Sequence, residues 1–320
     1  MAQREVPVPM WHRIGTSVVE AETAQEALIA SALNWTVEKV PLFADVSGKK
    51  VRVPERFATV RSDTGAALGV VGKSYRPVQN VEALNFMDSI IQAKEATYES
   101  AGSLNGGRIV WMTAKLPTIA GIDPVDKYLL LTTSHDGTTP VMAAAIALRI
   151  WCANQIQAAI RKARNKFRIR HTTNVEFKIE EARKALAGSL SYFHEVDEIY
   201  NRLKQVKFSQ DKLVELVEKV FAHELDPDER SNRQNTRLDN ITSEIIRLAD
   251  LGMGTELPGV RGTAWGAFNA ITEYLDHYTT PKGKKANEDE RLINSAWFGS
   301  IALKTQKAFD ETVALAKLAA

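Results

Sequence analysis

The sequence predicts an α+β fold, in which antiparallel β-hairpins and helices form the N-terminal half and helices alone follow. Short β-branched runs bounded by turn sequences are concentrated before about residue 174. After Asn174, apolar residues recur at the spacing of amphipathic helices, and glycine and strand-like runs become rarer. We therefore divide the chain into an α+β domain, residues 1–174, and an all-helical domain, residues 175–320.

The first elements follow from capping and turn residues. Thr23 and Glu26 stand at the spacing of a capping box, which predicts a helix that ends near Leu33. Ser62-Asp63-Thr64-Gly65 has the composition of a hairpin turn. Short strand-like runs lie before and after that turn, at residues 35–40, 51–53, 57–61 and 67–71.

Further hairpins are predicted before the chain becomes helical. Asn80 is expected to cap a helix over residues 81–93. Strands over 97–104 and 108–116 flank the turn Asn105-Gly106-Gly107, and strands over 128–133 and 140–145 flank Asp136-Gly137. A helix from Ile146 to Ala163 and an alternating segment, 166–172, end this half. The amphipathic helices of the second half are expected at residues 175–207, 209–223, 228–251, 263–277 and 288–318.

The composition is that of a globular chain without a membrane span. Of the 320 residues, 44% are hydrophobic and 25% are charged. No apolar run approaches the roughly 20 residues of a transmembrane helix, and the first residues lack the pattern of a secretion signal. The single cysteine, Cys152, excludes an intramolecular disulfide framework, so we expect a cytoplasmic protein.

Charge is distributed unevenly along the chain. The net charge is only +2, but no carboxylate occurs from Gly137 to Val175. That interval holds seven cations, namely Arg149, Arg161, Lys162, Arg164, Lys166, Arg168 and Arg170. The rest of the chain therefore sums to −5. This asymmetry is typical of a localised electrostatic interface for nucleic acid.

The alternation at residues 166–170 is the most informative part of this interval. On a strand, Lys166, Arg168 and Arg170 share one face, and the apolar residues between them share the other. Neighbours on one face lie about 6.6–7 Å apart, close to the phosphate spacing of an extended nucleic-acid strand. Two alternatives stay open: cations that compensate the dipole of a solvated helix end, and a protein–protein surface.

Four residues outside the acid-free interval are further candidates for the same groove: Arg61, Lys73, Tyr75 and Arg76. Arg61 and Lys73 flank the second predicted hairpin. Tyr75 lies between cations and has the aromatic face needed to stack on a base. The alternative for Tyr75 is an ordinary turn, in which the ring packs at the start of the next helix.

No pattern points to catalysis, and we expect no enzyme, cofactor or metal. The histidines show no metal-ligand spacing, and Cys152 has no general base assigned to it. The chain has no phosphate-binding loop of the ATPase kind. A metal-dependent nuclease would need clustered carboxylates, for which Asp123, Asp126 and Asp136 are the nearest acids before the basic interval.

Several motifs resemble the phage/plasmid-like family, a group of uncharacterised proteins carried by bacteriophages, plasmids and some bacteria. The most specific are Leu148-Arg-Ile-Trp-Cys152-Ala-Asn154 and Ile169-Arg-His-Thr172. Others are Pro9-Met-Trp-His12, Gly72-Lys-Ser-Tyr75-Arg-Pro77, Gly106-Gly-Arg-Ile-Val-Trp111 and Trp265-Gly-Ala-Phe-Asn269. The resemblance implies a distant similarity to Rad-fifty-two-type annealing proteins, whose ring subunits hold single-stranded DNA in a basic groove.

The leading hypothesis is ATP-independent binding of single-stranded DNA by a homo-oligomer, for which a ring is one arrangement, with strand annealing in phage or plasmid recombination. The helical domain would serve oligomerisation or the recruitment of partners. A second hypothesis is a phage or plasmid accessory protein that acts through protein–protein contacts. A metal-dependent nuclease is the third.

Overall fold

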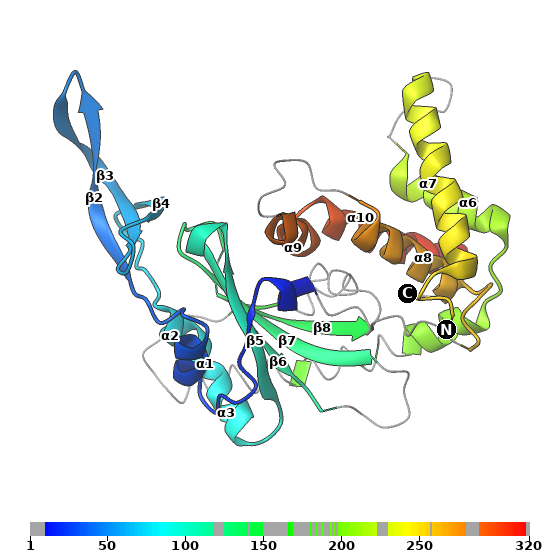
Figure 1. Cartoon of the computed structure of the whole chain (residues 1–320), viewed down its shortest axis with the longest axis horizontal. Helices are drawn as coiled ribbons and strands as arrows, with labels where there is room; N and C mark the ends of the chain where they lie inside the picture. The colour runs from blue at the N-terminus through cyan, green and yellow to red at the C-terminus, as the bar shows by residue number, and fades with distance from the viewer. Residues whose placement is uncertain are drawn as a thin grey trace.

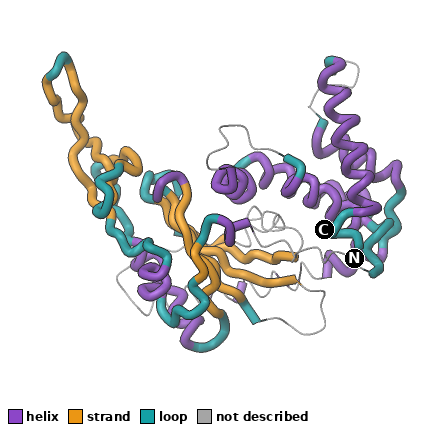
Figure 2. Tube along the Cα trace, viewed as in Figure 1, coloured by secondary structure: helices purple, strands orange, loops and turns teal. Residues whose placement is uncertain are grey.

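The computed structural model describes residues 10–117, 125–139, 141–149, 166–168, 198–222, 230–256, 258–279 and 288–317, with six more residues between 180 and 195. Its architecture confirms the predicted class, because antiparallel sheets are followed by a helical region. Figures 1 and 2 show the sheets on one side of the molecule and the long helices on the other. None of the described helices is both long and apolar enough to cross a membrane.

A six-stranded antiparallel sheet forms the centre, in the order β1-β5-β6-β7-β8-β9. Its strands are β1 (Thr16–Ser17), β5 (Thr97–Leu104), β6 (Ile109–Lys115), β7 (Val125–Ser134), β8 (Met142–Arg149) and β9 (Lys166–Arg168). The short η3 (Asn105–Gly107) joins β5 to β6 at the predicted turn. The strands predicted on both sides of Asp136-Gly137 are β7 and β8.

The helix predicted from Ile146 is wrong at its start. Residues 146–149 continue strand β8, where Ile146 pairs with Tyr128 and Arg149 with Val125. The alanine-rich run 143–147 favours a helix by propensity, but pairing with the buried strand β7 overrides that preference. The rest of the predicted helix, residues 150–163, lies outside the described residues.

The middle strands of this sheet are buried on both faces. In β6, Trp111 contributes to one apolar cluster, while Val110 and Met112 contribute to the other. In β7, Leu130 belongs to the same cluster as Trp111, and Leu129 belongs to the cluster of Val110 and Met112. Successive side chains of a strand point to opposite faces, so the continuous apolar runs of the sequence fill two layers at once.

Short helices cover one face of the sheet. They are α1 (Ala24–Ala30), α2 (Asn80–Leu84), η2 (Asn85–Met87) and α3 (Asp88–Gln92). Thr23 caps α1 as predicted, although the Glu26 carboxylate accepts from the amide of Glu22. The single helix predicted over 81–93 is divided into three pieces, and its N-cap is Gln79. Asn80 does not cap, because its amide donates to the carbonyl oxygens of Leu33 and Trp35.

The helical region covers the other face. It contains α6 (Gln210–Phe221), α7 (Asn232–Leu251), α8 (Ala264–His277), α9 (Glu288–Phe298) and α10 (Ser300–Leu315). Almost every residue of α8 is buried among its neighbours. The helix predicted over 288–318 is broken at Gly299, where a Cβ would lie 2.9 Å from Cα of Ser295. A glycine therefore permits the close turn between α9 and α10.

A second, three-stranded sheet carries a long hairpin away from the body. Its strands are β2 (Val37–Val46), β3 (Lys49–Arg61) and β4 (Ala67–Gly72), and β3 and β4 meet at the predicted turn Ser62–Gly65. β2 and β3 extend much farther than predicted, to a tight turn at Ser47-Gly48. β4 pairs with β3 only as far as Arg56. Residues 43–52, which we call the arm, thus form a two-stranded ribbon that projects into solvent (Figure 1).

The first described segment packs on its own sheet. It begins with η1 (Met10–Arg13), and Trp11 is 1% exposed. The indole of Trp111 lies against both Gly15 and Gly102, where added Cβ atoms would be 2.4 and 2.5 Å from ring carbons. Trp297 of α9 meets the same indole edge to face, with ring centroids 5.3 Å apart. Trp111 therefore touches the first segment, the sheet and the helical region.

Replacing Gly102 with alanine should destabilise the protein by about 1–3 kcal/mol, because the new methyl group overlaps the Trp111 ring. Urea unfolding measures this change. Gly72→Ala is the matched control, since a Cβ there meets nothing within 4 Å, and it should change stability by less than about 0.5 kcal/mol. Equal stabilities of the two variants would contradict the tight packing of Trp111.

Candidate nucleic-acid interface

Strand β9 brings part of the predicted basic interval to the edge of the central sheet. Lys166 pairs with Ala144, Phe167 with Ala143 and Arg168 with Met142. The predicted strand is confirmed over these three residues. Arg149 is the last residue of β8, opposite Val125. The other four predicted cations, Arg161, Lys162, Arg164 and Arg170, lie outside the described residues.

Arg61 lies at the end of β3 and is already engaged. Its guanidinium makes two hydrogen bonds to the Asp63 carboxylate, at 3.0 and 2.6 Å, and lies 4.3 Å from the ring centroid of Trp35. The hydrogen bond from Arg61 lowers the pKa of the Asp63 carboxyl. A phosphate at Arg61 would have to compete with this carboxylate.

Lys73, Tyr75 and Arg76 lie on the connection between β4 and α2. Lys73 and Arg76 are exposed, and the Lys73 ammonium is 3.3 Å from the Glu55 carboxylate. Tyr75 is half-buried, and its hydroxyl donates to the carbonyl oxygen of Ser134 at 3.3 Å. Burial raises the pKa of the Tyr75 phenol. The ring thus packs against the turn between β7 and β8.

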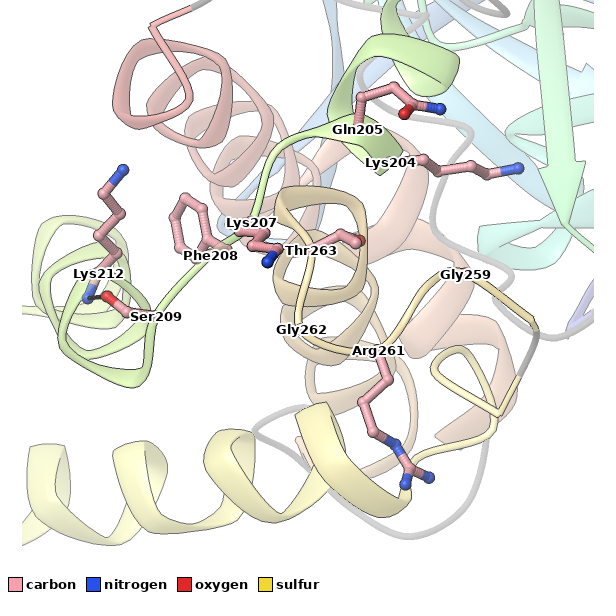
Figure 3. Close-up of a pocket in the computed structure, with 10 residues that line it drawn as sticks. All are labelled: Lys204, Gln205, Lys207, Phe208, Ser209, Lys212, Gly259, Arg261, Gly262 and Thr263. Carbon is pink, nitrogen blue, oxygen red and sulfur yellow. Dashed lines mark hydrogen bonds between the residues drawn. The ribbon is translucent and has the colours of Figure 1, made fainter.

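A second basic site, which we call the basic pocket, lies in the helical region. Its volume is about 710 Å³ (Figure 3). The lining residues come from two segments: Lys204, Gln205, Lys207, Phe208, Ser209 and Lys212, with Gly259, Arg261, Gly262 and Thr263. Four of these are cations, and the lining residues within the described part of the chain include no acid.

Two helices begin at the basic pocket. Ser209 is the N-cap of α6 and accepts from the amide of Lys212, and Thr263 is the N-cap of α8 and accepts from the amide of Gly266. An antiparallel bridge between Lys207 and Thr263 holds the two starts together, with Phe208 N donating to Gly262 O at 2.9 Å. Helix N-termini carry partial positive charge, so they add to the field of the cations.

The cations of the basic pocket spread over its rim and do not converge on one point. Figure 3 shows Lys204, Lys212 and Arg261 pointing in different directions, with Lys207 between them. Burial lowers the pKa of the Lys204 ammonium. Phe208 is only 8% exposed, so its ring forms the floor and offers no open face for stacking. This arrangement suits an extended polyanion better than a single small phosphate.

The sequence predicts the helices that line this pocket, but it does not indicate that they lie side by side. The helix starts at Ser209 and Thr263 were both predicted. The cations are distributed among ordinary amphipathic helices, so no local run of charge marks them. Only the Lys207–Thr263 bridge, and the packing of both α6 and α8 against α7 and α10, bring residues 204–212 and 259–263 together.

A buried carboxylate, Glu99, forms a further polar centre in the structure. It is 8% exposed and accepts from Trp11 Nε1 at 3.1 Å, Thr113 Oγ1 at 2.6 Å, Ser100 Oγ at 2.9 Å and the imidazole of His12. Burial alone would raise the pKa of Glu99, but the hydrogen bonds from His12, Thr113 and Ser100 outweigh it and lower that pKa. An ionised carboxylate with all of these donors is a poor general base. It fastens the first segment to β5 and β6.

The described part of the chain contains no candidate metal-binding site. No three or more histidine, cysteine, aspartate or glutamate side chains gather there in a way that would hold an ion. His135 is buried, and desolvation lowers its pKa to about 4. Its Nε2 is 2.8 Å from Oδ1 of Asn80, and its ring meets Trp35 edge to face, so it joins the two sheets.

Comparison with known proteins gives one match. A family model described as a domain of unknown function (DUF932) matches residues 67–297, which is more than two thirds of the chain. The matched part runs from β4 to α9, so it includes strands β5 to β9 of the central sheet and the basic pocket, and it excludes β1 and the arm. No curated protein and no solved structure matches the chain.

Replacing Glu99 with glutamine should destabilise the protein by about 1–3 kcal/mol at pH 7, because a neutral amide cannot accept from all of these donors. The folded-state pKa of Glu99 lies below its unfolded value. Its contribution to stability is therefore present above about pH 4.3 and is lost as the pH falls through the folded-state pKa.

The difference in unfolding free energy between wild type and Glu99→Gln should therefore shrink as the pH falls from about 5 to 3. Urea unfolding at several pH values measures it. Glu38→Gln, at an exposed glutamate, serves as control and should track wild type throughout. A difference that stays constant with pH would contradict the ionised state of Glu99.

Proposed function

The chain belongs to the DUF932 family, a domain of unknown function, and for this member we propose single-stranded DNA binding that requires no ATP. The observation that supports it best is the basic pocket, in which four cations and two helix N-termini share one surface without an acid among the lining residues. The acid-free interval 137–175 provides a second basic segment. Both suit the phosphate backbone, which dominates the affinity of proteins for nucleic acid.

The kind of contact favours recognition of the backbone over recognition of the bases. In the basic pocket the donors are the ammonium and guanidinium groups of four cations, which suit phosphate oxygens. Phe208 is too buried to stack on a base. We therefore propose binding without sequence preference, in which the bases of the bound strand stay accessible.

Strand annealing is the reaction that such binding would serve. A strand that is held by its phosphates keeps its bases free to pair with a complementary strand, and this step needs no ATP. We propose that a homo-oligomer holds the strand in this way during recombination of phage or plasmid DNA. This part of the proposal rests on the resemblance to Rad-fifty-two-type proteins.

A second candidate function is an accessory role through protein–protein contacts. The observation that favours it is the arm, whose apolar residues Phe43, Val46 and Val51 are each at least half exposed. Large exposed apolar side chains gathered on one element are typical of an interaction surface.

Replacing Lys207 and Arg261 with alanine should weaken binding to a fluorescent single-stranded oligonucleotide. Each lost phosphate contact should reduce the slope of log K against log salt by about 0.7, so the double variant should lose about 1.4. Fluorescence anisotropy at several salt concentrations measures both quantities. The control, Arg13→Ala with Arg233→Ala, removes the same charge from exposed residues that do not line the basic pocket. Equal slopes for the two double variants would remove the pocket from the interface.

The edge strand is tested separately by Arg168→Glu with Arg170→Glu. The alternation of this segment places both cations on one face, so binding should weaken while the melting temperature stays nearly unchanged. Loss of folding would show that this strand is buried.

Annealing of complementary oligonucleotides without ATP should be faster with wild type than with either binding-deficient variant. Wild-type protein that leaves the annealing rate unchanged would contradict the annealing proposal.

A further inference from the structure

The arm is amphipathic, although the described residues of its own chain leave it uncovered. Cross-strand partners share a face, so the pairs Ala44–Val51 and Val46–Lys49 place Ala44, Val46 and Val51 on one face together with Lys49. The pairs Phe43–Arg52 and Asp45–Lys50 belong to the other. Val46 and Val51 are 55% and 50% exposed. A free two-stranded ribbon is only marginally stable in water, so burial of this apolar face against a partner would stabilise it.

The arm also has a fixed direction. Arg61, at the base of β3, donates to the carbonyl oxygen of Gly106 in the turn between β5 and β6, and a Cβ on Gly107 would lie 3.0 Å from its Nη1. Gly69 of β4 packs equally closely on Asp136, with a notional Cβ 2.6 Å from its Cα. These contacts hold the base of the three-stranded sheet against the central sheet and set the direction in which the ribbon leaves it.

A pocket elsewhere on the N-terminal half has the opposite character; we call it the acidic pocket. It has a volume of about 580 Å³ and lies between the segment after β1 and the end of α3. Its apolar lining is Val19, Ala21, Ile91 and Ala96, and Val19 is 54% exposed. Glu20 and Glu22 also line it, against one cation, Lys94.

Charge and shape of the two surfaces are complementary. The arm carries Lys49, Lys50 and Arg52 against Asp45 alone, a net charge of +2. The acidic pocket combines two exposed carboxylates with an apolar floor. Its volume lies within the range that accommodates several side chains. With Val46 and Val51 in the pocket, Lys49 of the same face would lie beside its glutamates, while Lys50 and Arg52 belong to the opposite face.

We propose that the arm of one copy of this chain occupies the acidic pocket of a second copy. The arm cannot fill the pocket of its own chain, because it points away from α1 and α3 (Figure 1). The contact is head-to-tail, with different surfaces on the two copies, so repetition builds a ring if the rotation closes and a filament if it does not. The inference rests on the homo-oligomer of the proposed function and does not depend on nucleic acid.

Two variants and their mixture test this contact in the absence of nucleic acid. The arm variant is Val46→Asp with Val51→Asp, and the pocket variant is Glu20→Lys with Glu22→Lys. All four side chains are exposed, so both variants should keep the wild-type melting temperature. Sedimentation velocity should show oligomers for wild type and monomers for each variant alone.

The mixture distinguishes a head-to-tail contact from others. The arm variant retains an intact acidic pocket, and the pocket variant retains an intact arm, so together they should form one junction and stop at a dimer. Leu251→Asp with Leu303→Asp, at exposed apolar residues elsewhere, is the matched control and should sediment as wild type.

Three results would overturn the proposal: a monomeric wild type, a pocket variant that still assembles, or a mixture that stays monomeric. A wild type that is monomeric would also remove the homo-oligomer. Assembly that persists in both variants would remove only this contact. Neither result bears on nucleic-acid binding, because both variants keep Lys207, Lys212 and Arg261, and the salt dependence of oligonucleotide binding is measured separately.

Discussion

The Trp111 indole occupies the point where three parts of the molecule meet. Gly15 and Gly102 leave room for it on the sheet, and Trp297 of α9 closes over its edge. Trp11 extends the contact, with its ring centroid 6.4 Å from that of Trp297. The helical region and the sheet consequently share one apolar cluster. The basic pocket and the arm are therefore held on one body, in a fixed relation to each other.

Charge is distributed along the chain so that contacts with a polyanion and contacts between copies would use different surfaces. Residues 37–61 carry six cations against three acids, and residues 137–175 carry seven against none. The remaining residues sum to −8. The two basic segments attract a polyanion and the net-acidic remainder repels it, except at the basic pocket, where Lys204, Lys207, Lys212 and Arg261 gather. The same acidity makes the rest of the surface, including Glu20 and Glu22, a suitable counterpart for the basic arm.

Local patterns predicted much of the fold, because turns and caps are local chemistry. The turns at Ser62–Gly65 and Asn105–Gly107 and the helix starts at Ser209 and Thr263 all follow from a few adjacent residues. The end of β8 does not follow from adjacent residues, since its alanine-rich residues become a strand only when β7 pairs with them. Most of the arm was missed because Lys49 and Lys50 interrupt its strand-like runs and Pro41 and Pro54 flank it. The basic pocket could not be read locally, because it depends on two segments that meet only after folding.

The basic pocket gathers positive charge on one surface, and this is the strongest physical reason to assign it an anionic ligand. Two opposite unit charges 4 Å apart attract by about 1 kcal/mol in water and by several times more near a protein surface. Lys204, Lys207, Lys212 and Arg261 all line the pocket, and the described lining residues include no carboxylate. By contrast, Arg61 and Arg247 are already paired with the carboxylates of Asp63 and Glu244. An extended anion could contact every cation of the rim, whereas a single small anion would reach only some of them.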